Sequence, residues 1–264
     1  MASRNGLNPK LRGSKGRGFN RALPAPFGWG NGIKAQGKGW LEIPRFVNKP
    51  MSNEWSFEYW VDATSLYGTL KCILSINEFS KNKSFFIDDY GGSVQFSSNL
   101  YTGGNSVPIN PRVHVVVTFK YDSKPTSGQS QIFLNGKLST TGYLDIAYPF
   151  NVERATLFAK ATTSTTQTQK WLCPVDEIRF YNKVLMDNEI SINYNGGIGG
   201  NPCVTENIFA WFEFERFELL DFSELQDGSD MRIGIKDISG NYNHAESYMF
   251  VTDPTSPDFV LTAF

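Results

Sequence analysis

Three glutamates near the end of the sequence have the residue type and the spacing that glycoside hydrolysis uses. They lie in the segment Glu213-Phe-Glu-Arg-Phe-Glu218. Retaining hydrolysis needs an acid and a nucleophile whose carboxyl groups lie about 5 Å apart. Alternate residues of one strand point to the same side of a sheet and can supply that separation. A glycoside hydrolase is therefore one hypothesis for this chain.

Other residue types that serve acid–base and nucleophilic catalysis are sparse. His114 and His244 are the only histidines, and we expect both imidazoles to be packed or hydrogen-bonded structural groups. No serine or cysteine lies in a nucleophile-elbow motif, so Ser-His-Asp catalysis finds no support. The cysteines are far apart and predict free thiols, without a disulfide framework or a metal knuckle. They are Cys72, Cys173 and Cys203.

The elements that must position these side chains follow an all-β pattern. Aromatic residues make up 14% of the 264 residues, and frequent Gly, Asn, Ser and Thr favour short strands joined by turns. Residues 55, 57, 59 and 61 are apolar and alternate with Ser56 and Glu58, which is the period of a strand. One short helix is predicted over 185–194, before Gly196 and Gly197.

Residues 1–37 differ from the rest of the chain. Residues 1–40 hold eight Lys or Arg and no acid, which leaves 17 basic and 26 acidic residues afterwards. Many glycines, together with Pro24 and Pro26, oppose a regular element here. Such an arm can contact an acidic protein surface, nucleic acid or the chain's own body, or remain a solvated tail. We expect it to dock on a larger assembly through Arg12, Lys15, Arg17, Phe19, Arg21, Phe27 and Trp29, with nucleic acid the less favoured partner.

The N-terminal residues lack the apolar core of a signal peptide, and no run is long enough to span a bilayer. We therefore expect no membrane insertion, and folding in a reducing cytoplasm is the default for a chain with free thiols.

Four segments, in order, resemble the laminin G-like branch of the concanavalin A-like lectin and glucanase superfamily. They are Trp55-Ser-Phe-Glu-Tyr-Trp-Val, Arg112-Val-His-Val-Val-Val-Thr-Phe, Ile132-Phe-Leu-Asn-Gly-Lys and Val175-Asp-Glu-Ile-Arg-Phe-Tyr-Asn-Lys-Val-Leu. The last segment, which continues to Gly197, is the most specific, and the resemblance covers about residues 38 to 200. It implies a jelly-roll β-sandwich over residues 38–264, preceded by the extended arm.

One departure from the resembled family concerns the order of its motifs. The family's opening motifs resemble Trp211-Phe-Glu-Phe-Glu and Asp237-Ile-Ser-Gly-Asn-Tyr-Asn-His-Ala, which come last here. The strand order therefore resembles a permuted one. We expect residues 208–264 to supply the opening strands of the same sandwich, because unpaired edges and an apolar face would otherwise remain. The alternative is a second, truncated copy that another subunit completes.

The resemblance also bears on the candidate sites. Relatives that cleave β-glucans use E-x-D-x-x-E, and Glu215 replaces the middle Asp here, so we expect no enzyme. Some laminin G-like domains bind one calcium ion at the rim of the sandwich. The candidate ligands for such an ion here are Asp88, Asp89 and Asp122. The alternative is that these aspartates cap turns. Glycans bind such folds through exposed rings, and core packing is the alternative role for the candidates Tyr90, Tyr101 and Trp171.

These observations together predict a non-catalytic virion structural or adhesion protein of a tailed bacterial virus, assembled in the host cytoplasm. It would be a capsid decoration protein, a head fibre or a tail component. The alternatives are a carbohydrate-binding module of a cellular surface system and, third, a β-glucan hydrolase. The expected partners are other virion proteins through the arm, a host-surface glycan, and further copies of the chain in a homo-oligomer.

Overall fold

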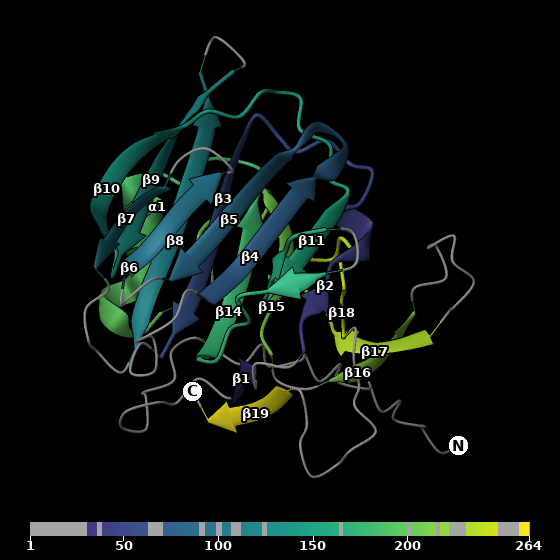
Figure 1. Ribbon diagram of the computed structural model, residues 1–264. Coiled ribbons are helices and arrows are strands. Elements are labelled where there is room, and N and C mark those ends of the chain that lie inside the picture. The colour runs from purple at the N-terminus through teal and green to yellow at the C-terminus, as the bar shows by residue number, and fades with distance from the viewer. Residues whose placement is uncertain are drawn as a thin grey trace, which may run out of the picture.

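Two antiparallel sheets face each other across an apolar core in the computed structural model (Figure 1). The structure describes residues 31–35, 39–62, 71–89, 93–98, 102–106, 112–122, 126–163, 166–199, 202–214, 217–221, 231–247 and 259–263. The predicted concanavalin A-like β-sandwich is confirmed. None of the helices in these ranges is long and apolar enough to cross a membrane.

Sheet A has eight strands in the order β10-β9-β8-β3-β14-β1-β19, and β15 also pairs with β14. The strands are β1 (Asn31–Ala35), β3 (Glu54–Val61), β8 (Val113–Tyr121), β9 (Gly128–Leu134), β10 (Lys137–Leu144), β14 (Pro174–Tyr181), β15 (Ile208–Phe212) and β19 (Phe259–Ala263). Helix α1 (Asp187–Tyr194) and the short 3-10 helix η4 (Asn195–Gly197) follow β14.

Sheet B has nine strands in the order β16-β17-β18-β2-β11-β4-β5-β6-β7. They are β2 (Leu41–Glu42), β4 (Lys71–Glu78), β5 (Lys83–Asp89), β6 (Ser93–Ser98), β7 (Thr102–Ser106), β11 (Arg154–Leu157), β16 (Glu218–Asp221), β17 (Met231–Ile235) and β18 (Ala245–Ser247). A separate small hairpin joins β12 (Lys160–Ala161) to β13 (Gln167–Thr168), and the short 3-10 helices are η1 (Pro44–Phe46) and η3 (Phe79–Lys81).

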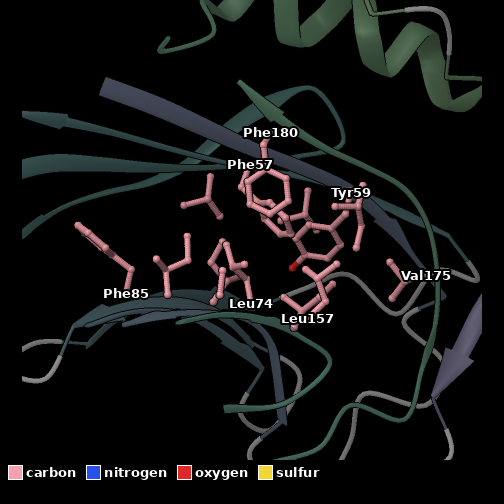
Figure 2. Close-up of a cluster of buried hydrophobic side chains, with 14 of the residues drawn as sticks. Phe57, Tyr59, Leu74, Phe85, Leu157, Val175 and Phe180 are labelled. Carbon is pink, nitrogen blue, oxygen red and sulfur yellow. The ribbon is translucent and has the colours of Figure 1, made fainter. Parts of the chain in front are cut away.

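The core lies between the sheets and follows the two-residue period of the strands. Trp55, Phe57, Tyr59 and Val61 of β3 all belong to it. Figure 2 shows Phe57 and Tyr59 on one side and side chains of β4, β5 and β11 on the other. The rings of Phe57 and Phe180 are 4.7 Å apart between centroids. Buried aromatic rings of this kind contribute large apolar areas to the contact between the two sheets.

The short helix is confirmed, and it starts two residues later than predicted. Asn195 ends it in the left-handed conformation with φ 46°, which Asn tolerates better than most residues. Glu189 accepts a hydrogen bond from the Met186 backbone N–H at 2.8 Å and so caps the start of the helix.

The expectation that no regular element forms before residue 38 is wrong. Residues 31–35 form β1, which pairs with β14 and β19 in sheet A. Ile33 is fully buried in the core. β1 pairs with residues 174–175 and 259–263, which are distant in the chain. This strand depends on those partners, and the local Gly-rich sequence has no strand pattern of its own.

The segment from residue 208 onward adds strands to both sheets. It contributes β15 and β19 to sheet A, and β16, β17 and β18 to sheet B. Glu246 of β18 pairs in register with Glu42 of β2. Strands β18, β17 and β16 therefore continue sheet B beyond β2, which is its first strand in the chain.

Candidate functional site

The face of sheet B that points away from the core is predominantly polar. Leu74, Ile76, Phe85 and Ile87 of the neighbouring strands β4 and β5 point into the core. Because side chains alternate along a strand, the residues between them point outward. The outward set on four adjacent strands is Ser75, Asn77, Ser84, Phe86, Asp88, Gln95, Ser97, Arg154 and Thr156.

A pocket of about 190 Å³ opens on this face, and we call it the outer pocket. Phe86 contributes an aromatic ring, and the Lys160 ammonium lies 3.8 Å from the ring centroid. The set of lining residues is Asn77, Phe79, Asn82, Lys83, Ser84, Phe86, Lys160, Ala161 and Thr162. Amide, hydroxyl and ammonium groups around a ring suit a ligand that has both hydroxyl groups and an apolar face.

The hairpin β12–β13 supplies one wall of the outer pocket and is fastened to sheet B. The Ala161 backbone N–H donates to Ser75 Oγ at 3.2 Å, and the Cys72 N–H donates to the Gln169 carbonyl at 2.7 Å. Arg154 Nη1 donates to the Thr163 carbonyl at 3.2 Å. The pocket is therefore built before any ligand arrives, which reduces the entropy cost of binding.

Two lysines at the outer pocket have different roles. Lys83 Nζ donates to the carbonyls of Ala147 and Pro149 at 2.8 and 3.0 Å and lies 3.4 Å from the Glu78 carboxylate. These contacts tie it to the neighbouring loop. Lys160 faces the Phe86 ring and is the cation that we expect a ligand to meet.

The candidate calcium ligands are not brought together. Asp88 lies inside β5 of sheet B, where Ser97 Oγ donates to it at 3.4 Å. Asp122 follows β8 of sheet A and accepts from Ser127 Oγ at 2.9 Å, and the side chain of Asp89 lies outside the described residues. No group of three or more His, Cys, Asp or Glu within the described ranges is placed to hold a metal ion.

Asp88 is instead part of a buried pair with Cys72. Burial raises the pKa of the Asp88 carboxyl. Burial, followed by the adjacent Asp88, also raises the pKa of the Cys72 thiol. Cys72 Sγ donates to the Leu74 carbonyl at 3.1 Å. This thiol is fully buried, so it packs as a small structural side chain.

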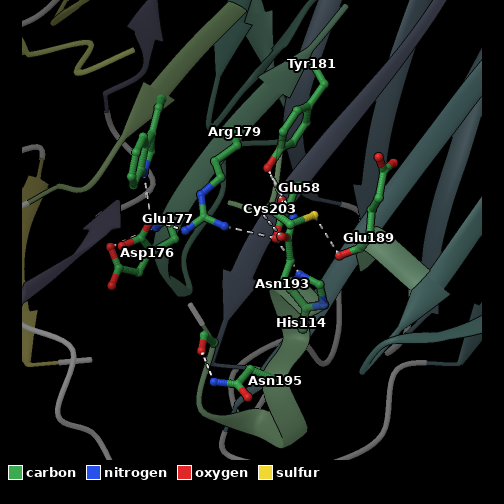
Figure 3. Close-up of polar contacts among 12 residues, drawn as sticks. Glu58, His114, Asp176, Glu177, Arg179, Tyr181, Glu189, Asn193, Asn195 and Cys203 are labelled. Atoms are coloured by element: carbon green, nitrogen blue, oxygen red, sulfur yellow. Dashed lines mark hydrogen bonds and ion pairs between the residues drawn. The ribbon is translucent and has the colours of Figure 1, made fainter. Parts of the chain in front are cut away.

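A buried ionic network lies on the other side of sheet A, between the sheet and α1 (Figure 3). Its centre is Glu58 of β3, which is 0% exposed. Glu58 Oε1 lies 2.8 Å from His114 Nε2 and 3.2 Å from Arg179 Nη1. Glu58 Oε2 accepts from the Tyr181 hydroxyl at 2.6 Å and from Asn193 Nδ2 at 2.9 Å.

The partners of Glu58 outweigh the cost of burying its charge. Burial alone raises a carboxyl pKa, but Arg179, His114 and Tyr181 together lower the pKa of Glu58 to about 2. Burial raises the pKa of the neighbouring Glu177, although Glu177 accepts from Arg179 Nη2 at 2.8 Å.

This network fastens α1 to the sheet and has no access for a substrate. Asn193 of α1 bonds Glu58 and also accepts from the Cys203 backbone N–H at 2.9 Å. Trp211 Nε1 of β15 donates to Glu177 at 2.7 Å. His114 is the histidine of this network and is fully buried. The expectation of a packed, hydrogen-bonded imidazole is confirmed for this residue.

The Asp237–His244 motif closes the free edge of β15. Asp237 accepts from the backbone N–H groups of Trp211, Ser239 and Asn243 at 2.8 to 2.9 Å. His244 Nδ1 accepts from the Asp237 N–H at 3.0 Å, so its predicted structural role is also confirmed. The loop bonds β15 through the Ile238 backbone N–H, which donates to the Trp211 carbonyl at 2.9 Å, and through the side chains of Asp237, Asn241 and Asn243.

The three glutamates do not share one strand, so the geometry proposed for hydrolysis is wrong. Glu213 follows β15 of sheet A, whereas Glu218 begins β16 of sheet B. Phe214 between them has φ 52°, a conformation that ends a strand. Glu215 lies outside the described residues.

The predicted ligand-binding ring of Trp171 is not exposed. It is 1% exposed in the core, and its Nε1 donates to the Cys173 carbonyl at 2.9 Å. Its Thr-rich neighbours suggested a loop, but the ring turns inward. Tyr90 and Tyr101 lie outside the described residues, as do Arg12, Lys15, Arg17, Phe19, Arg21, Phe27 and Trp29. The sequence reasoning missed the outer pocket and also Tyr242, which is 62% exposed on the Asp237–His244 loop.

Comparison with known families identifies the class of this sandwich. A laminin G family model described as "Concanavalin A-like lectin/glucanases superfamily" matches residues 35–191. The match covers more than half of the chain, and the chain belongs to this family. A comparison with curated proteins found no match.

Solved structures share the fold at low identity. A proposed carbohydrate binding protein from Bacteroides ovatus is similar over 89% of this chain and 60% of its own, with 12% identity and a TM-score of 0.56. An SAP-like pentraxin from Limulus polyphemus is similar over 62% and 82%, with 10% identity and a TM-score of 0.46. The Ruminococcus gnavus IT-sialidase CBM40, bound to α2,3-sialyllactose, is similar over 65% and 97%, with 18% identity and a TM-score of 0.47.

Proposed function

We propose that the chain is a non-catalytic module that recognises glycans through the outer pocket of sheet B. The observation that carries the proposal is the outer pocket itself, in which Asn77, Lys160 and hydroxyl groups surround the Phe86 ring. The family assignment and the fold shared with the Bacteroides ovatus protein support it.

The size and the chemistry of the outer pocket suit one sugar ring. Its volume of about 190 Å³ is below the roughly 300 Å³ at which pockets for drug-sized ligands begin. Lys160 is partly exposed and lies over the Phe86 ring, so its ammonium is the group that bonds the hydroxyl groups of a sugar. Phe86 and Asn77, which are 4% and 2% exposed, form the floor of the pocket.

Loss of the Lys160 ammonium or the Asn77 amide should weaken glycan binding. A glycan panel first identifies the tightest ligand, and titration calorimetry then compares Lys160→Ala and Asn77→Ala with the wild type. We expect Lys160→Ala to weaken binding about tenfold or more, because a hydrogen bond to a charged group contributes about 1.5–3 kcal/mol. Asn77→Ala should weaken binding less, because a hydrogen bond between neutral groups contributes about 0.5–1.5 kcal/mol.

Lys137→Ala is the matched control, because Lys137 is exposed on β10 of the other sheet. Its affinity should equal that of the wild type. Unchanged binding in both pocket variants would contradict the proposed site.

Glycan binding should occur without hydrolysis. Glu213 follows β15 of sheet A and Glu218 begins β16 of sheet B, so a panel of β-glucans should release no reducing ends above background. Turnover that disappeared in Glu213→Gln or Glu218→Gln would overturn this part of the proposal.

We further propose that the module acts on a virion as a structural or adhesion protein, with the basic arm as its anchor and a homo-oligomer as its assembled form. The support comes from the sequence, where residues 1–40 carry eight positive charges and no acid. A carbohydrate-binding module of a cellular surface system agrees with the comparisons at least as well.

Deleting residues 1–20 should weaken association with particles in a salt-dependent way, because charge pairing governs encounter. Phe27→Ala or Trp29→Ala should weaken it even at high salt, because apolar anchors slow dissociation. Co-sedimentation with particles measures both effects. Full incorporation of the deleted chain would favour the cellular module instead.

A further inference from the structure

The described lining of the outer pocket carries two ammonium groups, those of Lys83 and Lys160, and no carboxylate. Lys83 lies 3.4 Å from the carboxylate of Glu78, which also pairs with Lys81 at 2.7 Å. The charge of Lys83 is therefore matched by a neighbouring acid. Lys160 is the residue that gives the pocket its positive charge.

Lys160 differs from the other cations of this face in the partner that it contacts. Arg154 of β11 pairs with the carboxylate of Glu42. The Lys160 ammonium instead lies 3.8 Å from the centroid of the Phe86 ring. A ring attracts a cation through its quadrupole but carries no net charge. This contact orients the ammonium and leaves its charge available to an anion.

Asp88 is the carboxylate that interacts electrostatically with Lys160 from within sheet B. Burial raises the pKa of Asp88, although Cys72 and Lys160 act in the opposite direction. Asp88 is only 4% exposed, and burial of this kind disfavours the charged form of a carboxyl group. Lys160 itself is partly exposed. Burial thus weakens the acid that would compete with a ligand, and the ammonium remains accessible from solvent.

The backbone that carries Lys160 is held on both sides. Thr156 Oγ1 donates to the Ala159 carbonyl at 2.8 Å, and the Ala161 backbone N–H donates to Ser75 Oγ at 3.2 Å. Both alanines are buried. Lys160 therefore projects from a fixed position, which reduces the entropy cost of pairing with a ligand.

We propose that the outer pocket prefers an acidic sugar, a uronic acid whose carboxylate pairs with the Lys160 ammonium. This inference rests on the proposed glycan recognition and names its substrate class. A bond between an ammonium and a carboxylate is roughly twice as strong as one between neutral groups. The exposed residues Asn82 and Thr162 of the pocket lining supply an amide and a hydroxyl for the hydroxyl groups of the same ring.

Matched pairs of short oligosaccharides test the effect of the charge alone. Galacturonate and glucuronate oligomers are each compared with their methyl esters, which keep the ring and remove the charge. Titration calorimetry is done at about 0.15 M salt, where long-range attraction is screened. We expect the acid of at least one pair to bind about tenfold more tightly than its ester. Lys160→Met, which keeps the apolar stem, should abolish this preference, and Lys160→Arg should retain it.

Two controls separate the outer pocket from general attraction of anions. Lys137→Met removes a charge on β10 of the other sheet, and deletion of residues 1–20 removes five positive charges of the arm. Neither change should alter the preference for the acid, and its loss in either would overturn the inference.

The two proposals fail in different ways. If each ester binds as tightly as its acid, and Lys160→Ala weakens both, glycan recognition stands and the preference for uronic acids is wrong. A preference for the acid that persists in Lys160→Met would also overturn the inference, because another group would then read the charge. Absence of binding to every acidic and neutral glycan would contradict both proposals.

Discussion

Replacing Glu58 with Gln should lower the free energy of unfolding by about 3–5 kcal/mol, the range for breaking a buried ion pair. The change removes the charge of one of the two carboxylates that pair with the fully buried Arg179, and Glu177 is the other. Urea unfolding at neutral pH measures the effect. Glu54→Gln is the matched control on the same strand, because its ion pair with Lys120 is partly exposed and such pairs contribute at most about 1 kcal/mol.

The same substitution should change the dependence of stability on pH. The folded pKa of Glu58 is about 2, below its ordinary value of 4.5. Its contribution, about 3 kcal/mol by linkage, is present above pH 4.5 and is lost as pH falls toward 2. Burial raises the pKa of Glu177, which gives a slope of the opposite sign, because the folded state then binds more protons than the unfolded state; Glu177 is present in both chains.

Urea unfolding at pH 5 and at pH 3 compares the free energy of unfolding of the wild type with that of Glu58→Gln. Glu78 and Glu189 also have lowered pKa values, and they contribute equally to the wild type and to Glu58→Gln. The wild type should therefore lose more stability than the variant between these pH values. Equal losses would show that Glu58 is not ionised in the folded protein.

Truncation after Gly200 should abolish cooperative unfolding. It removes β15 and β19 from sheet A and three strands from sheet B, and with them the core residues Ala210, Phe212, Phe214, Ile235 and Ala245. Each large apolar side chain contributes about 1.5–3 kcal/mol. The total approaches the roughly 5–15 kcal/mol by which a whole domain is stable.

Thermal denaturation followed by circular dichroism checks the truncation. We expect a broad, weak transition in place of a sharp one, and strong binding of apolar dyes at the exposed faces. A soluble truncated chain with an unchanged transition would show that residues 38–200 fold alone, in favour of a second, truncated copy completed elsewhere.

The sequence predicted the sandwich because strand periodicity is local information. The alternation over Trp55, Phe57 and Tyr59 became the inner face of β3, as predicted. The polar residues of the same alternation, Ser56 and Glu58, point to the opposite face, yet both are fully buried. Ser56 bonds the backbone of Lys183 and Leu185, and Glu58 bonds Asn193 of α1. These partners are more than 100 residues away in the chain, and no local pattern records them.

The candidate site was less predictable, because it depends on contacts between distant segments. Asn77 and Phe86 meet Lys160 only because β12 crosses the outer face of sheet B. Exposed rings were expected near Gly- and Thr-rich stretches, but composition does not fix the direction of a side chain, and Trp171 turned into the core. The motif around Asp237 offered a better signal, since a polar loop with one aromatic residue exposes that ring, Tyr242.

The location of the bound glycan is the decisive test of recognition through the outer pocket. Amide chemical shifts of the isotope-labelled chain, followed during titration with the tightest glycan of the panel, report it residue by residue. We expect shifts concentrated in residues 75–86 and 160–162, around the outer pocket. Shifts confined to another surface, such as the loop that carries Tyr242, would contradict it, and so would the absence of binding to every glycan of the panel.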